Sequence, residues 1–395
     1  MPSKTEVPPL ARYPEEWEKA VTSLGARSFA GKQVFRWIQG RSVMSVDGMT
    51  DIAGSLREKL REAGVGPVLE VALVKTSTDG TRKLLVKMKD GATVETVLIP
   101  GTTGPKRFAE GADAASDAAA DTEADADAAA ADTDEEEEGG AVRVTQCIST
   151  QVGCAMGCVF CASGVAGFKR HMGADEVIAQ VLLAKEYLYP GEALRNVVLM
   201  GMGEPLHNYD ATVRTLRLLT HPEGLHLSSR RVTVSTSGLV PEIRRLGEDF
   251  QGRIGLAISL HAADDDTRTR LMPINKKHPL SELMKALREY PLPPRRRITI
   301  EYTLVAGKND TLEEARKLGK LLRGLPVKIN LIPMNPIEAS TLGPTARDRV
   351  LAFQTVLTDT GYSVFIRKRR GDDVAAACGQ LALLGAKPKV RVDRS

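Results

Sequence analysis

The sequence is short of cysteine, of aromatic residues and of long apolar runs. Its 395 residues include five cysteines, and Phe, Trp and Tyr together make up 4%. A small and odd number of cysteines argues against the disulfide framework of a secreted protein and favours a reducing compartment. No apolar run approaches the ~18 residues that a membrane-spanning helix needs, and Met1–Trp17 lacks the apolar core of a signal peptide. We therefore expect a soluble cytoplasmic protein that has no membrane partner.

One segment lacks basic residues altogether. Residues 108–142 contain no Lys or Arg but 13 acidic residues, and most of the others are Ala, Gly, Ser and Thr. This composition cannot bury enough apolar surface to offset the entropy of ordering, so we predict a disordered acidic insertion over residues 104–140. A tolerated loop expansion explains it most simply, and a mimic of nucleic acid that screens a basic surface is the alternative. The simpler explanation predicts that deleting residues 108–138 leaves activity intact.

The rest of the chain is strongly basic. Outside the acidic segment 54 basic residues face 37 acidic ones, a surplus of 17. A folded body of this charge favours a polyanionic partner, most often nucleic acid, although charge also serves solubility. The basic residues gather in clusters that could each be ordinary solvated surface, at Lys169-Arg170, Arg230-Arg231, Arg295–Arg297 and Lys368–Arg370, and in the tail 386–395.

The first hundred residues predict two kinds of structure. Residues 13–64 carry apolar residues at intervals of three and four, which is typical of helices. Residues 69–100 are rich in β-forming residues, and the pairs Asp79-Gly80 and Asp90-Gly91 are typical of hairpin turns. We therefore predict a small N-terminal helical and antiparallel β module over residues 1–103.

The remainder alternates between strands and helices. Strand patterns occur at 142–150, 195–203, 230–238, 253–262, 297–307, 327–334 and 362–368, and helix patterns between them at 174–188, 209–220, 311–324 and 345–361. This alternation predicts an α/β fold with a parallel sheet, closing into a complete or partial barrel over residues 141–385, ahead of the basic tail. In such barrels the chemistry gathers at the C-terminal ends of the strands.

Three of the five cysteines lie within eight residues. Cys154, Cys158 and Cys161 form the pattern CxxxCxxC, which offers a [4Fe–4S] cubane three thiolates and leaves one iron open to a small chelating molecule. Zinc is the alternative, but structural zinc sites close with a fourth ligand from a second Cys or His pair, and the sequence has no such pair. His171 could close a zinc site in principle. The spacing favours the iron–sulfur cluster.

Several motifs together carry a resemblance to a known family. The segments are QVGCAMGCVFCASG, GMGEPLHN, STSG, AISLHA, NLIPMNP and RGDDVAAACGQLA. With the strand and helix pattern they resemble the RlmN/Cfr family of radical S-adenosylmethionine (SAM) RNA adenine methyltransferases. The resemblance covers most of the chain outside the acidic insertion, and implies a partial (β/α)6 barrel that binds a [4Fe–4S] cluster and SAM.

The resemblance implies roles for the residues at the strand ends. Gly203 and Glu204 match the segment that binds the amino group of SAM, and a carboxylate suits an ammonium partner. The positions that match the rest of the nucleoside site are Ser235, Ser259, Leu260, His261 and Asn335. Taken alone, Gly-Glu-Pro could be a simple turn and His261 a hydrogen-bonded wall residue.

The two remaining cysteines and one glutamate match the catalytic positions of the family. By this resemblance Cys378 is methylated and carries the methyl group, and Cys147 resolves the covalent RNA adduct through a transient disulfide. Glu95 matches the residue that takes up the proton lost from the base. Each cysteine could instead be a small buried hydrophobe, and Glu95 could lie on the solvated face of a strand.

The resemblance implies methylation of carbon 2 of an adenine in 23S ribosomal RNA and in transfer RNAs. That carbon is electron-poor and cannot attack the methyl group of SAM as a nucleophile, which explains the need for a radical. Methylation of carbon 8, an antibiotic-resistance activity in the same family, stays open. So do a non-enzymatic iron–sulfur protein that binds RNA or senses redox state, and a zinc-stabilised RNA-binding scaffold. We also expect an electron donor such as flavodoxin or ferredoxin, and a monomer.

Overall fold

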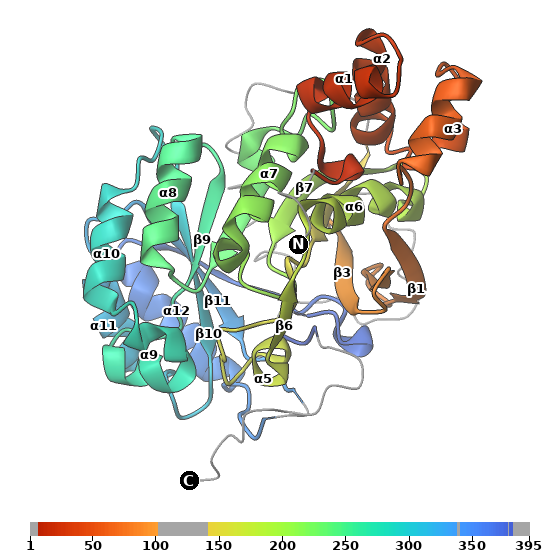
Figure 1. Ribbon diagram of the computed structural model, residues 1–395. Coiled ribbons are helices and arrows are strands. Elements are labelled where there is room, and N and C mark those ends of the chain that lie inside the picture. Colours follow the sequence, from red (N-terminus) through yellow and green to blue (C-terminus); the bar gives the residue numbers. More distant parts are fainter. Residues whose placement is uncertain (1–6, 102–140, 338–339, 378, 382–395) are drawn as a thin grey trace.

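The computed structural model describes residues 7–101, 141–337, 340–377 and 379–381. The acidic insertion predicted over residues 104–140, the tail 386–395 and Cys378 lie outside these ranges. A small group of N-terminal helices lies at one side of a larger body of strands and helices (Figure 1). Within the described ranges, no helix combines the length and apolarity that crossing a bilayer requires.

The N-terminal helices form as the sequence predicts, as α1 (Pro14–Ser23), α2 (Phe29–Phe35) and α3 (Gly54–Glu62). The carboxylate of Glu16 accepts a hydrogen bond from the backbone N–H of Tyr13 at 2.7 Å and so satisfies a donor at the start of α1. Trp17 and Val21 lie one helical turn apart and are both fully buried. At Gly31 an added Cβ would come within 2.4 Å of the backbone of α1, so a glycine lets the two helices touch.

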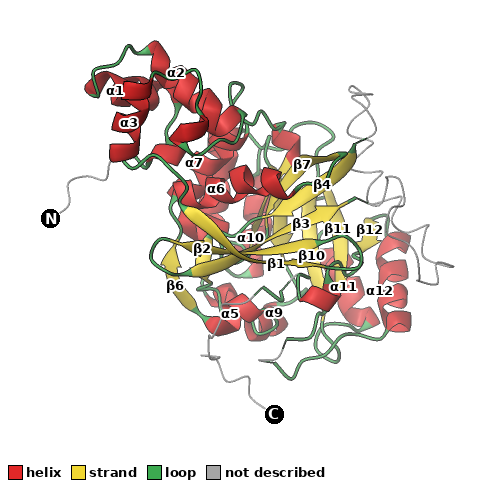
Figure 2. Cartoon of the chain, turned by 90° about the vertical axis from the view of Figure 1, so that its right-hand side faces the viewer, coloured by secondary structure: helices red, strands yellow, loops and turns green. Residues whose placement is uncertain are grey.

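The strands join into one long sheet in the order β1-β2-β3-β4-β7-β8-β9-β10-β11-β12. Neighbouring strands from β4 to β12 run parallel, whereas β1, β2 and β3 pair antiparallel and β3 pairs antiparallel with β4. The sheet therefore extends the N-terminal strands directly into the partial barrel (Figure 2). The bounds are β1 Leu69–Thr76, β2 Arg82–Met88, β3 Thr93–Pro100, β4 Val142–Cys147, β7 Glu192–Leu199, β8 Val232–Thr236, β9 Gly255–Ser259, β10 Ile298–Leu304, β11 Val327–Pro333 and β12 Ser363–Ile366.

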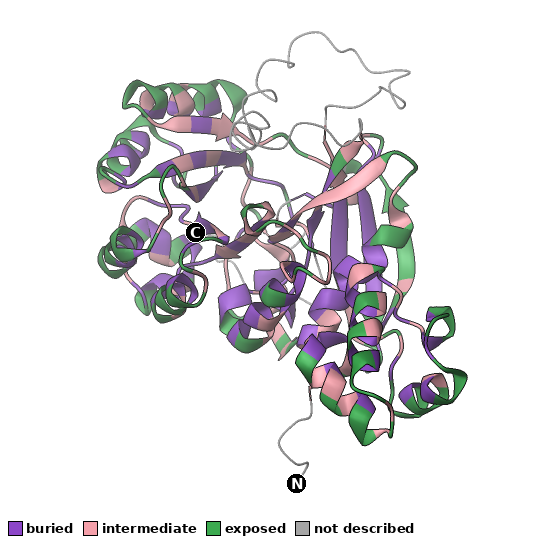
Figure 3. Cartoon of the chain, turned by 90° about the horizontal axis from the view of Figure 1, so that it is seen from above, coloured by how far each residue is buried: buried purple, intermediate pink, exposed green. Residues whose placement is uncertain are grey.

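Helices cover the outside of the parallel strands. They follow the strands in turn as α6 (Ala174–Ala184), α7 (Tyr209–Leu219), α8 (Val240–Phe250), α9 (Asp265–Leu271), α10 (Leu280–Glu289), α11 (Leu312–Leu321) and α12 (Arg347–Asp359). The strands are buried at the centre and the helices expose their outer faces (Figure 3). The predicted α/β partial barrel is thus confirmed. Between β4 and α6 in the sequence, the chain forms a separate two-stranded sheet of β5 (Gln151–Gly153) and β6 (Phe168–His171), together with the short helix α5 (Ala162–Ala166).

The ends of the acidic insertion meet in the sheet. Pro100 of β3 pairs with Val144 of β4, and the backbone N–H of Gly101 donates to the carbonyl of Arg143 at 2.7 Å. Three residue pairs further along the same two strands, Val97 lies opposite Cys147. The described residues that flank the insertion therefore lie side by side, with the end of β3 paired to the start of β4.

Candidate active site

The three clustered cysteines lie on the loop between β5 and α5. The backbone N–H of Cys154 donates to the carbonyl of Gly167 at 3.2 Å, and that of Cys161 donates to the carbonyl of Cys158 at 3.3 Å. An added Cβ at Gly164 would lie 2.9 Å from the backbone of Cys158, so α5 can pack on the loop only because this residue is glycine. All three cysteines line one cavity at the C-terminal ends of the parallel strands.

The environment of these thiols fits a cationic cluster. Burial is the main reason that the pKa of Cys154 is raised to about 12 and that of Cys158 well above its usual value, and neighbouring thiols act in the same direction. Buried thiolates need a compensating positive charge, which bound iron supplies. Among the described residues, no three His, Cys, Asp or Glu side chains gather as a single metal ion would require. A cubane is held differently, because each thiolate binds a separate iron.

His171 is directed away from the cysteines. Its Nδ1 atom lies 3.0 Å from Nε2 of Gln151, and the same amide nitrogen lies 3.1 Å from Nδ1 of His207. The two imidazole rings are in edge contact, with their centroids 4.9 Å apart. His171 therefore belongs to a surface cluster on β6 and does not complete a four-ligand zinc site with the three cysteines.

The same cavity contains most of the residues predicted to bind SAM. Gly203, Glu204, Ser235, Ser259, His261 and Asn335 all line it. Leu260 does not line it, because its side chain is fully buried in the core. The cavity is also lined by Ser237, Glu301, Thr303 and Arg367, to which the sequence analysis gave no role. Ser237 lies inside the matched segment STSG, where only Ser235 received a role, and the other three lie outside the matched segments.

Glu204 is a buried carboxylate held by the end of β8. One carboxylate oxygen accepts hydrogen bonds from the backbone N–H and the hydroxyl of Ser237, at 2.7 and 2.8 Å, and the other accepts from the N–H of Leu206 at 3.1 Å. Burial raises the pKa of Glu204, and the bonds from Ser237 act in the opposite direction. Such a carboxylate is oriented to receive an ammonium group, which would compensate its charge.

His261 lies on the cavity wall as a neutral imidazole. Its Nδ1 atom accepts a hydrogen bond from the backbone N–H of Thr303 at 2.8 Å, so the proton is on Nε2. Burial lowers the pKa of His261 to about 3, and the ring of Phe160 packs against its edge at a centroid distance of 4.8 Å. The residue can therefore donate one hydrogen bond but carries no charge at neutral pH.

Cys147 and Glu95 come together through the pairing of β3 with β4. Cys147 is buried and lines a second cavity, which shares Cys161, Asn335 and Arg367 with the first. Glu95 is only 8% exposed, so it does not lie on a solvated face. The hydroxyl of Ser149, two residues after Cys147, donates to the backbone carbonyl of Glu95 at 2.6 Å.

Lys83 of β2 connects Glu95 to the C-terminal segment, a link that the sequence did not reveal. Its Nζ atom lies 2.9 Å from Oε1 of Glu95 and also donates to the carbonyl of Ala375 at 2.9 Å. The side chains of Lys83 and Glu95 are 10% and 11% exposed, so the ion pair is largely buried. A lysine on a strand usually points to solvent, and its partner Ala375 is 292 residues away.

The segment around Cys378 is fixed from both sides, although Cys378 itself lies outside the described ranges. The carbonyl of Gly379 accepts from the N–H of Ala162 at 2.8 Å, and the carbonyl of Leu381 accepts from the hydroxyl of Ser163 at 2.6 Å. On the other side, the carboxylate of Asp79 in the β1–β2 turn accepts from the N–H of Gly371 at 3.1 Å. The four described cysteines form no disulfide with one another, so a permanent disulfide is not supported.

The basic clusters are distributed over both ends of the barrel. Arg367 and Lys368–Arg370 line the cavity of Cys147. Arg230-Arg231 and Arg295–Arg297 precede β8 and β10, at the opposite end of the parallel strands. Arg170 is held by Asp90 at 2.7 Å and by Glu176 at 2.7 Å. The surface suited to RNA beside the cavities is therefore formed mainly by residues 367–370.

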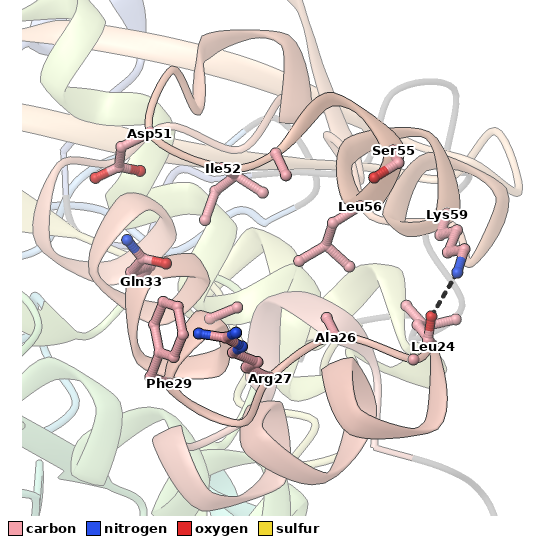
Figure 4. A pocket seen from close by; sticks show the side chains of 13 residues that line it. Leu24, Ala26, Arg27, Phe29, Gln33, Asp51, Ile52, Ser55, Leu56 and Lys59 are labelled. Atoms are coloured by element: carbon pink, nitrogen blue, oxygen red, sulfur yellow. Dashed lines mark hydrogen bonds between the residues drawn. The ribbon is translucent and has the colours of Figure 1, made fainter.

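A further hollow lies between α2 and α3, away from the cysteines (Figure 4). Phe29, which is 56% exposed, borders it together with Arg27 and Gln33. Lys59 closes one end by donating to the carbonyl of Leu24 at 2.7 Å. An exposed ring beside a guanidinium and an amide is the kind of surface on which an unpaired base can stack.

Comparisons with known proteins agree with this geometry. Residues 148–322 match the radical SAM superfamily, and residues 13–65 match the ribosomal RNA large subunit methyltransferase N-terminal domain. The dual-specificity RNA methyltransferase RlmN of Sorangium cellulosum is 67% identical and that of Syntrophobacter fumaroxidans 40%; the matches cover 98% and 93% of this chain, and 98% and 94% of those proteins. A radical SAM methyltransferase from Sphaerobacter thermophilus superposes with a TM-score of 0.81 at 37% identity, covering 94% of this chain and 98% of that one. The chain therefore belongs to the RlmN family of radical SAM RNA methyltransferases.

Proposed function

We propose that this protein methylates carbon 2 of an adenine in 23S ribosomal RNA and in transfer RNAs, with SAM as methyl donor. The observation that carries the proposal is the cavity of Cys147, which also contains Cys161 and the two neighbours of Cys378, Ala377 and Gly379. The arrangement thus sets a resolving thiol, the flanks of a methyl-carrying thiol and the cluster loop around one space. The dual specificity of the relatives supports two classes of RNA substrate.

In this proposal each residue has one task. Cys154, Cys158 and Cys161 hold the [4Fe–4S] cluster, and Glu204 receives the amino group of SAM. When bound, the cluster and SAM supply a 5′-deoxyadenosyl radical that can take a hydrogen atom from an S-methyl group. Cys378 carries that methyl group.

Release of the product follows from thiol chemistry. The thiolate of Cys147 attacks the sulfur of Cys378, so that an S–S bond forms and the bond from sulfur to the RNA-bound carbon breaks. That carbon takes up a proton and becomes the methyl group. Glu95 accepts the proton lost from the ring, and the single electron that the ring radical must also lose would pass to the cluster when it is bound. The resulting disulfide is transient, because an external reductant restores both thiols.

The partners follow from the surfaces. RNA would contact residues 367–370 beside the cavity and the hollow of the N-terminal helices, with an affinity that falls steeply with salt. A one-electron donor such as flavodoxin or ferredoxin would reduce the cluster. We propose that the protein acts as a monomer in the reducing cytoplasm, where an iron–sulfur cluster and free thiols persist.

Nucleoside mass spectrometry tests the proposal. Unmodified 23S ribosomal RNA and transfer RNA are incubated anaerobically with reconstituted protein, SAM and reductant, with the Cys378→Ala variant as control. We expect 2-methyladenosine from both RNAs with the unaltered protein and none with the variant. Formation of 8-methyladenosine would agree with the proposed mechanism but would show that carbon 8, and not carbon 2, is methylated. Formation of 5′-deoxyadenosine without either methylated base would support the radical chemistry and contradict the assignment of these RNAs as substrates.

A further inference from the structure

Arg268 of α9 is a buried cation that donates no hydrogen bond to a carboxylate in the described part of the chain. It is 0% exposed, and its hydrogen bonds go to neutral acceptors. Nε donates to the carbonyl of Leu260 at 3.1 Å, Nη2 to the carbonyl of Ser237 at 2.6 Å, and Nη1 to Oδ1 of Asn275 at 2.9 Å. Because a guanidinium remains charged at neutral pH, a positive charge lies inside the protein, where a charge without compensation is costly. The carboxylate of Asp265 on the same helix compensates it only at a distance and less than Cys158 does.

The charge lies beside the cysteine loop. The carbonyl of Leu271, at the end of α9, accepts a hydrogen bond from the N–H of Val159 at 3.1 Å, between two of the cysteines. Arg268 and Cys158 lie close enough to interact electrostatically. Ser237 donates to Glu204 and accepts from Arg268, so the guanidinium also holds the strand end behind the proposed SAM site.

We propose that Arg268 is the fixed countercharge of the cluster and raises its reduction potential, an inference that rests on the cluster of the proposed function. Reduction adds one electron to a group already bound by three thiolates, so the reduced form is the more negative. A nearby buried cation stabilises that form more than the oxidised form, because the electrostatic interaction grows with charge and is little screened there. Arg268 is thus a positioning and tuning residue that needs no contact with RNA.

Three variants separate charge from shape. Arg268→Met removes the charge, Arg268→Lys keeps it but loses most of the hydrogen bonds, and Arg270→Met removes an exposed charge from the same helix. The reconstituted proteins are titrated potentiometrically without RNA, with the electron paramagnetic resonance signal of the reduced cluster as readout. We expect the equilibrium constant for reduction of the cluster to fall at least tenfold in Arg268→Met, which lowers the midpoint potential by about 59 mV for one electron. The midpoint potentials of Arg268→Lys and Arg270→Met should be nearly unchanged.

The proposal would be overturned if the midpoint potential of Arg268→Met equalled that of Arg270→Met. It would also be overturned if the midpoint potential of Arg268→Lys fell as far as that of Arg268→Met. Arg268→Gln serves as a second neutral variant. If neither neutral variant retains iron while Arg268→Lys does, the charge is required and the proposal stands. If Arg268→Lys loses iron as well, Arg268 has only a structural role and the proposal is overturned. If the unaltered protein gives no electron paramagnetic resonance signal, it holds no such cluster, and the proposed function fails with it.

Discussion

At the scale of single residues, the site is defined by charges that are buried with a specific partner. Glu204 is held by Ser237, Glu95 by Lys83, and Arg268 by backbone carbonyls. The positions that match the family indicated Glu204 and Glu95, and a carboxylate at position 204 also suits an ammonium partner. They did not indicate Lys83 or Arg268, since the partners of both lie far away in sequence or are backbone atoms that leave no pattern.

The ion pair of Lys83 and Glu95 gives the first prediction at this scale. Lys83→Met leaves a buried carboxylate without its cation, which costs about 3–5 kcal/mol of the free energy of unfolding. Adding Glu95→Gln to this variant removes the unpaired charge, so the double variant should recover part of that loss while staying inactive on RNA. Urea unfolding and nucleoside mass spectrometry measure the two effects.

Lys83→Arg is the matched control, because it keeps the charge beside Glu95. We expect it to retain most of the stability and a reduced but measurable turnover. If Lys83→Met unfolded at the same urea concentration as the unaltered protein, the pair would contribute nothing, and its link to the segment of Cys378 would lose its importance.

At the scale of elements, the periodicity of the sequence predicted the parallel strands and most of their helices, because buried strands alternate with amphipathic helices. It did not predict the pairing of β3 with β4, which brings Glu95 beside Cys147 across the whole acidic insertion. Register between distant strands depends on tertiary packing, which no local pattern records. Leu260, which the resemblance places at SAM, packs its side chain into the core and accepts a hydrogen bond from Arg268 through its backbone carbonyl, so any contact with SAM would come from its backbone.

The turn after β7 gives a prediction about backbone conformation. Gly203 has φ of +103°, and an added Cβ would lie 2.6 Å from the side chain of Gln151. Gly203→Ala therefore combines left-handed strain with a clash and should displace Glu204, with a loss of stability of about 1–3 kcal/mol and of 5′-deoxyadenosine formation. Chemical unfolding and chromatography of the nucleoside product test both parts.

Gly191 offers a control for the strain alone. Its φ is +85°, and an added Cβ would meet nothing within 4 Å. Gly191→Ala should cost up to about 1 kcal/mol of stability and leave 5′-deoxyadenosine formation unchanged. Equal loss of this product in both variants would show that the clash at Gln151 has no part in holding Glu204.

At the scale of the whole molecule, the N-terminal module and the barrel share one sheet. Arg82 of β2 is fully buried and donates to both carboxylate oxygens of Glu192 at the start of β7, at 2.7 and 3.0 Å. We propose that the division into residues 1–103, 104–140, 141–385 and 386–395 is one of sequence composition and not of separate folded bodies. The sequence could predict where composition changes, but not that strands on either side of the insertion would pair.

The acidic insertion gives the last prediction. Its flanks are joined by the N–H of Gly101 and the carbonyl of Arg143, at the start of β4, whereas the cysteine loop follows the other end of that strand. Deleting residues 108–138 should therefore leave Glu95 opposite the end of β4 and keep turnover on RNA within about twofold, since longer loops cost little.

A second variant keeps the length but replaces the 13 acidic residues by Asn, Gln and Ser. Because a tolerated loop expansion explains the insertion most simply, this variant should behave like the unaltered protein at every salt concentration. A rise in RNA affinity in both variants would show instead that the insertion competes with RNA for the basic surface, and loss of turnover with the cluster present would make it a working part of the enzyme.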